Sequence, residues 1–393
     1  MNGSLRARGA LIPRIDVLTG FREPFRFERE EEMTGLLMEA LAHNASDLYI
    51  QPELPICAMV EGRMVAMTDR TIDYAEIQEL LKWLAGRDTA VTDIVAGKSV
   101  NAKYDLFDPA KRDARGDKVR YPFRVNASPI EHYSDTGAQL VLRAIGQDPP
   151  RWGDVGLTED LLRLLTPRDG IIYVAGATGS GKTTTLAAVI RHCLEDDTPI
   201  KGNFITAEEP IEFSFRNVHS SHSIIVQSQV PMHFPSFYAS NREAMRRKPG
   251  LMMVGELRDQ ESIQTAVEAA QTGHPVMGTV HATNASATLR RLISRFPQEE
   301  RSTAIYDIID SARLIMAQRL VTGVDGRRLA VREYVAFTDS VKERLADLPS
   351  MGKVTQALRA IVESEGHSFS KEADRLLAAG RITETVAESL RHE

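Results

Sequence analysis

The chain has 393 residues, of which 42% are hydrophobic and 26% charged, and this composition predicts a globular protein of two or three domains. Its 48 basic and 54 acidic side chains give a net charge of −6, which disfavours nucleic acid as the main partner. The two cysteines, Cys57 and Cys193, form no CxxC pair, which argues against a disulfide framework or a cysteine-zinc site and fits a reducing compartment.

The N-terminal segment 1–30 is polar, arginine-rich and irregular in pattern. It has no continuous apolar core, so it does not read as a secretory signal, and no apolar run in the chain approaches the roughly 20 residues of a membrane-spanning helix. We expect a flexible arm here, with a docking segment as the alternative. A peripheral contact with a membrane machine stays open.

Residues 31–146 show the mixed pattern of an α+β domain with mostly antiparallel strands. Apolar positions at helical spacing predict helices over 33–44 and 74–87. Alternating and apolar runs predict strands over 46–51, 56–67, 121–130 and 138–145, and a turn at Glu61-Gly62 divides the second of these runs.

A linker rich in proline and turn-forming residues follows at 147–156, and after it the pattern changes. From 157 to 340 strand-like runs alternate with helices, which is typical of a parallel sheet with crossover helices. The expected strands are 171–175, 203–207, 251–255 and 276–280. A helix is expected over 303–320, a strand pair over 327–337, and a helical tail over 341–393.

Residues 176–183 read GATGSGKT and lie between a buried strand and a helix. Glycines at this spacing let successive backbone N–H groups point at phosphate oxygens. Lys182 can reach the β- and γ-phosphates, and the Thr183 hydroxyl can hold Mg²⁺. The residues predicted to bind the nucleotide are Gly176, Ala177, Thr178, Gly179, Ser180, Gly181, Lys182, Thr183 and Thr184.

Acidic residues follow the phosphate loop, residues 176–183, at the ends of two predicted strands. Glu208, Glu209 and Glu212 lie in AEEPIEF, and one of them is a candidate general base that holds the attacking water; a solvated acidic turn is the alternative. Glu256 directly follows the apolar run LMMVG, where it is placed like the second carboxylate of phosphate-loop NTPases, which faces Mg²⁺ and its waters. A surface position at a helix start is the alternative for Glu256.

The segment TGHPVMGTVHATNA places His274 and His281 on either side of a predicted strand. His281, at the carboxyl end, can contact the γ-phosphate, although a lone histidine is more often structural. The histidines lack standard zinc spacing. In AQRL, Gln318 and Arg319 are expected near the end of a helix, and this short motif alone does not indicate a function.

Together these motifs resemble the secretion and pilus motor ATPases, the PilT-like proteins of the type II/type IV secretion superfamily. The resemblance covers about residues 35–390 and includes SDLYIQ, FRVNA and ADRLLAAGRIT. It implies a PAS-like N-terminal domain, a linker and a RecA-like ATPase domain, assembled into a ring that is usually a hexamer. It also implies ATP and Mg²⁺ as ligands.

The resemblance assigns roles residue by residue. Lys182 and Thr183 would bind phosphate and Mg²⁺, and Glu212 would be the catalytic base of an acidic box completed by Glu208 and Glu209. Glu256 would be the second acid, at the metal through water. His274 and His281 would form a histidine box. Arg124 and Arg143, with Arg120 a weaker candidate, would reach the nucleotide from the N-terminal domain and neutralise charge on the γ-phosphoryl group; for each arginine a solvated strand-edge position is the alternative.

The chain departs from the family pattern at several points. It has Lys248-Pro249-Gly250 where DPD is common, Tyr49 in DLYI where histidine is common, and Glu209 where aspartate is common. It lacks the four-cysteine insert of many assembly motors, which argues against a type II secretion or pilus-assembly motor. The pattern looks most like the type IVB branch of DotB and TraJ proteins.

We therefore expect a ring-forming ATP hydrolase that couples hydrolysis to domain rotation and powers a type IVB secretion or conjugation apparatus. The alternatives are a type IV pilus retraction motor, a RecA-like nucleic-acid translocase and an assembly factor that uses nucleotide binding more than turnover. The expected location is cytoplasmic, peripheral at the inner membrane through apparatus proteins, with no direct nucleic acid partner. The tail either binds the apparatus or packs on the RecA-like core.

Overall fold

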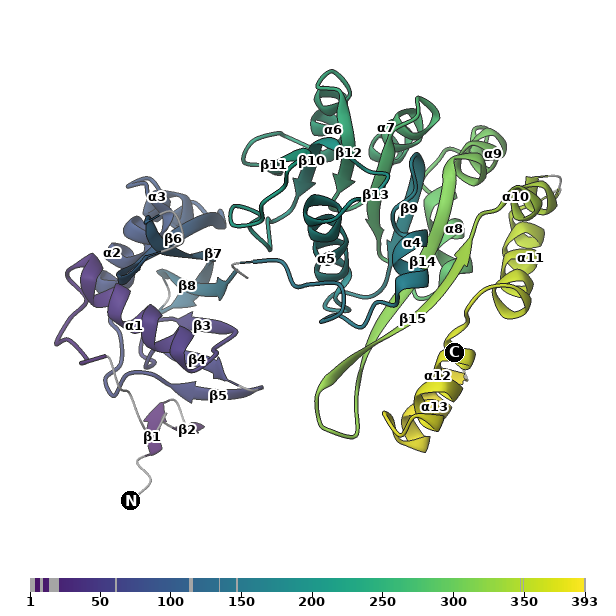
Figure 1. Ribbon diagram of the computed structural model, residues 1–393. Helices are drawn as coiled ribbons and strands as arrows, with labels where there is room; N and C mark the ends of the chain where they lie inside the picture. Colours follow the sequence, from purple (N-terminus) through teal and green to yellow (C-terminus); the bar gives the residue numbers. More distant parts are fainter. Residues whose placement is uncertain are drawn as a thin grey trace. The chain divides into compact units, whose positions relative to one another are not determined.

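The structure is a computed structural model, and its described residues are 4–7, 10–13, 21–60, 62–112, 116–133, 135–145, 148–346, 348 and 350–391. The chain divides into two compact units, Met1–Gln147 and Asp148–Glu393 (Figure 1). No described residue belongs to a helix long and apolar enough to cross a bilayer.

The first unit is built on an antiparallel sheet. Its described strands pair in the order β5-β4-β3-β8-β7-β6. The strands are β3 Asp47–Ile50, β4 Cys57–Val60, β5 Arg63–Ala66, β6 Val100–Arg112, β7 Lys118–His132 and β8 Asp135–Ala144. The helices that share its apolar core are α1 Glu30–Ala42, α2 Tyr74–Ala85 and α3 Ala90–Val95. The predicted α+β domain is therefore confirmed.

Strand β7 shows how the pleat separates core from surface in this unit. Phe123 and Val125 are buried, whereas Arg124 between them is exposed. Successive side chains of a strand point to opposite faces, so the arginine lies on the face away from the core.

Some features of the first unit differ from the prediction or lie outside it. Within the segment expected to be an irregular arm, β1 Ser4–Ala7 pairs antiparallel with β2 Ala10–Pro13. Strand β6 was not predicted, because its sequence mixes charged residues with few apolar ones. Glu61 of the predicted turn and Gln147 at the start of the linker lie outside the described residues.

The second unit contains a largely parallel sheet in the order β11-β10-β12-β13-β9-β14-β15, in which only the β14–β15 pairing is antiparallel (Figure 1). The strands are β9 Gly170–Ala175, β10 Gly202–Glu208, β11 Ser223–Gln229, β12 Pro249–Val254, β13 Pro275–Val280, β14 Ala312–Thr322 and β15 Arg328–Ala336. The predicted parallel sheet is confirmed, whereas β11 was not predicted.

Helices cover both faces of this sheet, as burial on both sides of β9 shows. Ile172 and Val174 share one apolar cluster with α4 Glu159–Leu164 and α5 Lys182–Glu195. Ile171 and Tyr173 belong to another cluster on the opposite face. The helices of that second cluster are α6 Phe237–Met245, α7 Gln260–Gln271, α8 Ala285–Ile293 and α9 Arg301–Ser311. A strand buried on both faces reads as a continuous apolar run, which is why its sequence predicted it.

The C-terminal helices pack on the same core. They are α10 Asp339–Ala346, α11 Met351–Ser364, α12 Phe369–Ala378 and α13 Glu384–Arg391. Leu358, Phe369 and Leu390 are buried in the cluster that covers one face of the sheet. Of the two readings of the tail, packing on the RecA-like core is therefore present in the structure.

The helix predicted over 303–320 is wrong from residue 312 onward. Helix α9 ends at Ser311, and residues from Ala312 onward form β14. Periodicity alone does not separate a short buried helix from a buried strand. Here Leu314 and Ile315 enter opposite core clusters, and β14 pairs with β9 on one side and β15 on the other, so tertiary context favours the strand. The predicted late strand pair over 327–337 is the single strand β15.

Candidate nucleotide site

The phosphate loop joins β9 to α5 at the carboxyl edge of the parallel sheet. Gly181 has φ +82° and caps the helix, a conformation that favours glycine. A Cβ at Gly176 would lie 2.5 Å from the Gln318 carbonyl oxygen, so a side chain cannot fit there. The N–H groups of the first turn, at 182–184, have no acceptor inside the helix. These amides and the helix dipole form a site suited to phosphate.

The side chain of Lys182 contacts the backbone of this loop. Its side chain is only 8% exposed, and Nζ donates hydrogen bonds of 2.9 Å to the carbonyls of Gly176 and Ala177. Burial lowers the pKa of Lys182, and the charges of Glu256 and Glu212 partly oppose that shift. The lysine and both carboxylates predicted for hydrolysis therefore lie within electrostatic reach of one another.

The loop also offers groups that a phosphate can use. Ala177, Thr178 and Gly179 are exposed, and among the described residues the buried Ser180 hydroxyl has no hydrogen-bond partner. Thr183 and Thr184 are half-buried in the first turn of α5. This donor set fits a triphosphate. No group of three or more His, Cys, Asp or Glu in the described chain can hold a metal alone, so Mg²⁺ at Thr183 and Glu256 would need phosphate and water as further ligands.

The acidic box splits into three different environments. Glu208 ends β10, is 4% exposed and accepts hydrogen bonds from Thr206 Oγ1 at 2.6 Å and Gln227 Nε2 at 3.0 Å. Burial raises the pKa of Glu208. Glu209 is exposed and pairs with Arg258 at 3.0 Å. Glu212 is exposed, and its charge acts on Lys182.

Gln227 on β11 is a residue that sequence reasoning missed. Besides Glu208 it contacts the loop that carries Glu212, since Nε2 donates to the Phe213 carbonyl at 2.8 Å and Oε1 accepts from the Phe215 N–H at 3.2 Å. It therefore fixes the path of that loop. The sequence SIIVQSQ gives no local signal for this contact, which depends on the pairing of β11 with β10.

Glu256 and His281 meet at the same sheet edge. They follow β12 and β13, two neighbouring parallel strands, and His281 Nε2 lies 3.8 Å from Glu256 Oε1. Burial and then the Lys182 charge lower the pKa of His281, and Glu256 opposes both. The neutral imidazole therefore predominates near pH 7. This is the carboxyl edge at which parallel sheets bind ligands.

His274 lies at the opposite end of β13. Its Nδ1 is 3.0 Å from the Pro249 carbonyl oxygen, which can only accept, so Nδ1 carries the proton. A strand of this length separates the two histidines by about 20 Å at the usual rise per residue. Within one chain the structure does not bring His274 to the loop, Glu256 and His281.

The predicted arginines lie in the first unit. Arg124 and Arg143 are register partners on β7 and β8, and both are exposed. Arg143 Nε donates to Asp47 Oδ1 at 2.7 Å, and Arg120 Nε lies 3.4 Å from Asp105 Oδ1. Their contact with a nucleotide stays a prediction.

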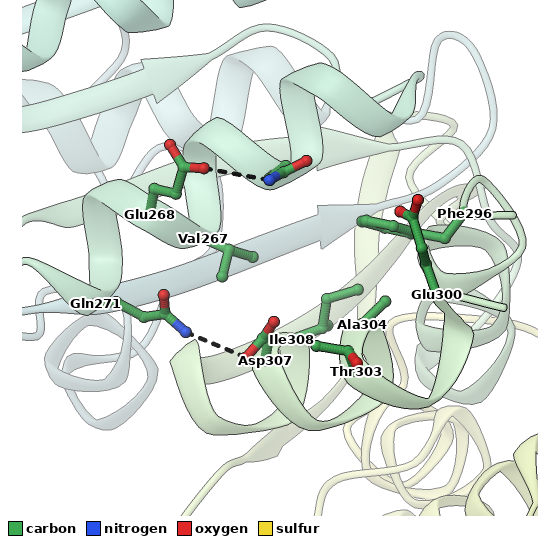
Figure 2. Close-up of a pocket in the computed structure, with 10 residues that line it drawn as sticks. Val267, Glu268, Gln271, Phe296, Glu300, Thr303, Ala304, Asp307 and Ile308 are labelled. Atoms are coloured by element: carbon green, nitrogen blue, oxygen red, sulfur yellow. Dashed lines mark hydrogen bonds between the residues drawn. The ribbon is translucent and has the colours of Figure 1, made fainter.

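A separate groove lies between α7 and α9 (Figure 2). Its cavity of about 290 Å³ is lined by apolar residues such as Val267 and Ile308 and by the acidic residues Glu268, Glu300 and Asp307. Gln271 Nε2 donates to Asp307 Oδ1 at 3.4 Å across it. No residue of the phosphate loop or acidic box lines this groove, so it is distinct from the candidate nucleotide site.

The chain is similar to several ATPases of known structure or sequence. The Yersinia pseudotuberculosis ATPase DotB is 44% identical, and its structure matches with a TM-score of 0.86 over 98% of this chain and 99% of that chain. The pilus retraction motor PilT with bound ADP is 25% identical, with a TM-score of 0.76 over 91% and 96%. The type IV pilus retraction ATPase PilT of Pseudomonas aeruginosa is 29% identical over 84% of this chain and 88% of its own.

These likenesses confirm the predicted resemblance, the fold and the nucleotide-dependent activity. The chain belongs to the family described as Type II/IV secretion system protein, whose model matches residues 29–345, and it is an ATPase of that family.

Proposed function

We propose that this ATPase forms a hexameric ring that powers a type IVB secretion or conjugation apparatus. The observation that carries the proposal is the 44% identity to the ATPase DotB along nearly the whole of both chains, tail included. A type IV pilus retraction motor is the second candidate, because PilT proteins also match most of the chain. The chain would act at the cytoplasmic side of the inner membrane, held there by apparatus proteins, without a direct nucleic acid partner.

The candidate site suggests how ATP is held. Lys182 would exchange the loop carbonyls of Gly176 and Ala177 for phosphate oxygens, and the amides of the first turn of α5 would bind the same group. Thr183 would hold Mg²⁺ directly and Glu256 through water. The ion would supply positive charge against the phosphates.

Among the acidic residues, Glu212 is our choice for the general base. Glu208 is buried, its pKa is raised and its Oε1 already accepts two hydrogen bonds, so it is poorly suited to hold a water. Glu209 is engaged by Arg258. Glu212 is exposed and near enough to Lys182 to act on its charge. Neutral His281 would contact the γ-phosphate from the next strand end.

Arg124 and Arg143 would supply further positive charge when the first domain closes on the nucleotide. Both are exposed on neighbouring strands of the first unit. An arginine that arrives only on closure would link hydrolysis to domain rotation.

The test combines ATP turnover with light scattering on the same purified samples, with and without DNA. The proposal expects a particle near six subunits whose turnover requires Lys182 and ignores DNA. Turnover multiplied by DNA would instead indicate a translocase. Neighbouring genes for pilins, in place of genes for a secretion channel, would favour the retraction motor.

A further inference from the structure

A buried arginine lies beside the phosphate loop without touching it. Arg332 on β15 is 5% exposed and is the register partner of Gln318 on β14. Its four hydrogen bonds all go to uncharged oxygens. Burial lowers the pKa of Arg332 to about 10, so the guanidinium remains charged at neutral pH. The charge of Glu372 opposes that shift, whereas the direct hydrogen-bond partners of the guanidinium are all neutral. Holding a buried cation with neutral groups is costly, so these contacts need a reason.

One side of Arg332 faces the start of the ATPase unit. NH2 donates to the Val155 carbonyl at 2.7 Å and NH1 to the Gly156 carbonyl at 3.0 Å. These carbonyls end the segment predicted as the linker. The planar fork of an arginine can hold both at once, which a lysine ammonium cannot do with the same geometry.

The other side of Arg332 faces the phosphate loop through Gln318. Arg332 Nε donates to Gln318 Oε1 at 2.8 Å, and Gln318 Nε2 donates to the Ser180 carbonyl at 2.7 Å. Thr185, in the first turn of α5, donates to the same Oε1 at 2.8 Å. Gln318 is 1% exposed, so water does not replace these bonds.

The segment before Gly156 is fastened to α5 as well. Arg191 NH1 donates to the Pro149 carbonyl at 2.6 Å, and the Trp152 and His192 rings meet edge to face with centroids 6.4 Å apart. The chain from 149 to 156 therefore contacts α5 near its last turns and the phosphate loop through Arg332.

We infer that Arg332 is a positioning residue that ties the backbone at Val155 and Gly156 to the phosphate loop through Gln318. The conformations of the phosphate loop and of the backbone segment 149–156 then change together when nucleotide binds. This inference rests on the nucleotide site proposed above and adds a route by which that site communicates with the linker. Measurements at both ends of this contiguous network test the coupling.

The first test measures amide hydrogen exchange over 152–158 with and without ADP. Gly156 and Leu157 donate backbone bonds of 3.1 Å to Gly153 and Trp152, so their amides report on this segment. ADP should slow their exchange about tenfold in the wild type and less than about twofold in Arg332→Lys. Arg313→Lys is the matched control, since Arg313 lies on β14 but pairs with Asp169, and it should behave as the wild type.

The second test is a double-mutant cycle on turnover. Arg332→Lys and Gln318→Ala should each lower kcat about tenfold, with KM changed less than about threefold, and the double variant should be no worse than the poorer single one. Gly156→Ala probes the same link without altering Arg332, because φ +67° strains an alanine there. Gly153→Ala, where a Cβ meets nothing within 4 Å, is its control and should be unchanged.

The outcomes distinguish a failure of the link through Arg332 from a failure of the proposed nucleotide site. ADP binding is titrated on the same samples, with Lys182→Ala as the reference that loses it. Binding that does not depend on Lys182 would contradict the proposed site. Normal binding with wild-type protection of 152–158 in Arg332→Lys, or additive losses of kcat, would overturn the link through Arg332. If Arg332→Lys does not fold, Gly156→Ala against Gly153→Ala decides the question by the same readouts.

Discussion

The two edges of the parallel sheet carry similar residue types but differ in how those residues are satisfied. At the carboxyl edge, the charge of Glu256 raises the pKa of both Lys182 and His281 against the effect of burial, and Glu256 and His281 approach only to 3.8 Å. At the opposite edge, Arg313 NH2 pairs with Asp169 at 2.5 Å and His274 contacts a backbone carbonyl. Groups paired within the protein are structural, whereas charged groups that converge beside open donors are suited to a ligand.

The largest expected effect sharpens this contrast directly. Lys182→Ala should lower ATP turnover roughly 10³-fold, because it removes a charged donor aimed at the phosphates. Arg313→Ala at the other edge should stay within about threefold of the wild type per folded molecule, since its ion pair is partly exposed. Steady-state ATPase assays on both variants measure the difference. Equal losses would erase the distinction between the edges.

Within the acidic box, Glu212 is expected to differ from its neighbour. Glu212→Gln should bind ATP normally and lose turnover by about 10²-fold, the scale of a positioned catalytic group. Glu209→Gln should change turnover by less than about threefold, because it loses only an exposed ion pair. Parallel ATP titrations and turnover assays give both quantities. Nearly unchanged turnover in Glu212→Gln would remove Glu212 from the role of base.

The two histidines give the simplest test of the difference between the edges, since one lies at each edge. His281→Asn should lower kcat about tenfold, the value of one charge-assisted hydrogen bond, whereas His274→Asn should change it by less than about twofold. Turnover assays at saturating ATP compare them. If His274→Asn were as damaging as His281→Asn, His274 would have to act in a site that a single chain does not complete.

The pH dependence follows from the lowered pKa of His281. A folded-state pKa below the unfolded value means that the unfolded chain binds more protons, so this group's contribution to stability is present above the unfolded pKa and lost as pH falls. If the neutral imidazole is required, turnover should fall only below the usual histidine value of about 6.5. A pH–rate profile of the wild type and His281→Asn measures this, and an acid limb that persists in the variant would assign it to another group.

The smallest effect is expected at Glu208. Because burial raises its pKa, its contribution opposes folding as pH rises above the unfolded value. Glu208→Gln keeps the acceptor oxygen for Thr206 and Gln227, so the free energy of unfolding at pH 7 should stay within about 1 kcal/mol of the wild type or increase. Urea unfolding tests this. A loss of several kcal/mol would mean that the ionised carboxylate is needed.

The parts of the molecule that local pattern determines were predictable. The strand at 171–175 is an apolar run, the glycine loop follows it, and parallel strands end at one edge, which places Glu256 and His281 together. What escaped prediction depends on pairing between distant segments. Residues 312–320 are a strand because β9 and β15 flank them, and Gln318, Arg332 and Gln227 gain their roles from that pairing. No local spacing encodes such contacts.

The most direct measurement is an amide-exchange footprint of ADP on the whole protein. If the carboxyl edge is the nucleotide site, protection should concentrate in 176–184 and in the segment after β13. It should extend to 152–158 through Arg332, and it should be weak around 168–170 and 272–274. Protection centred on the opposite edge or on the groove between α7 and α9, with none in the phosphate loop, would contradict the account.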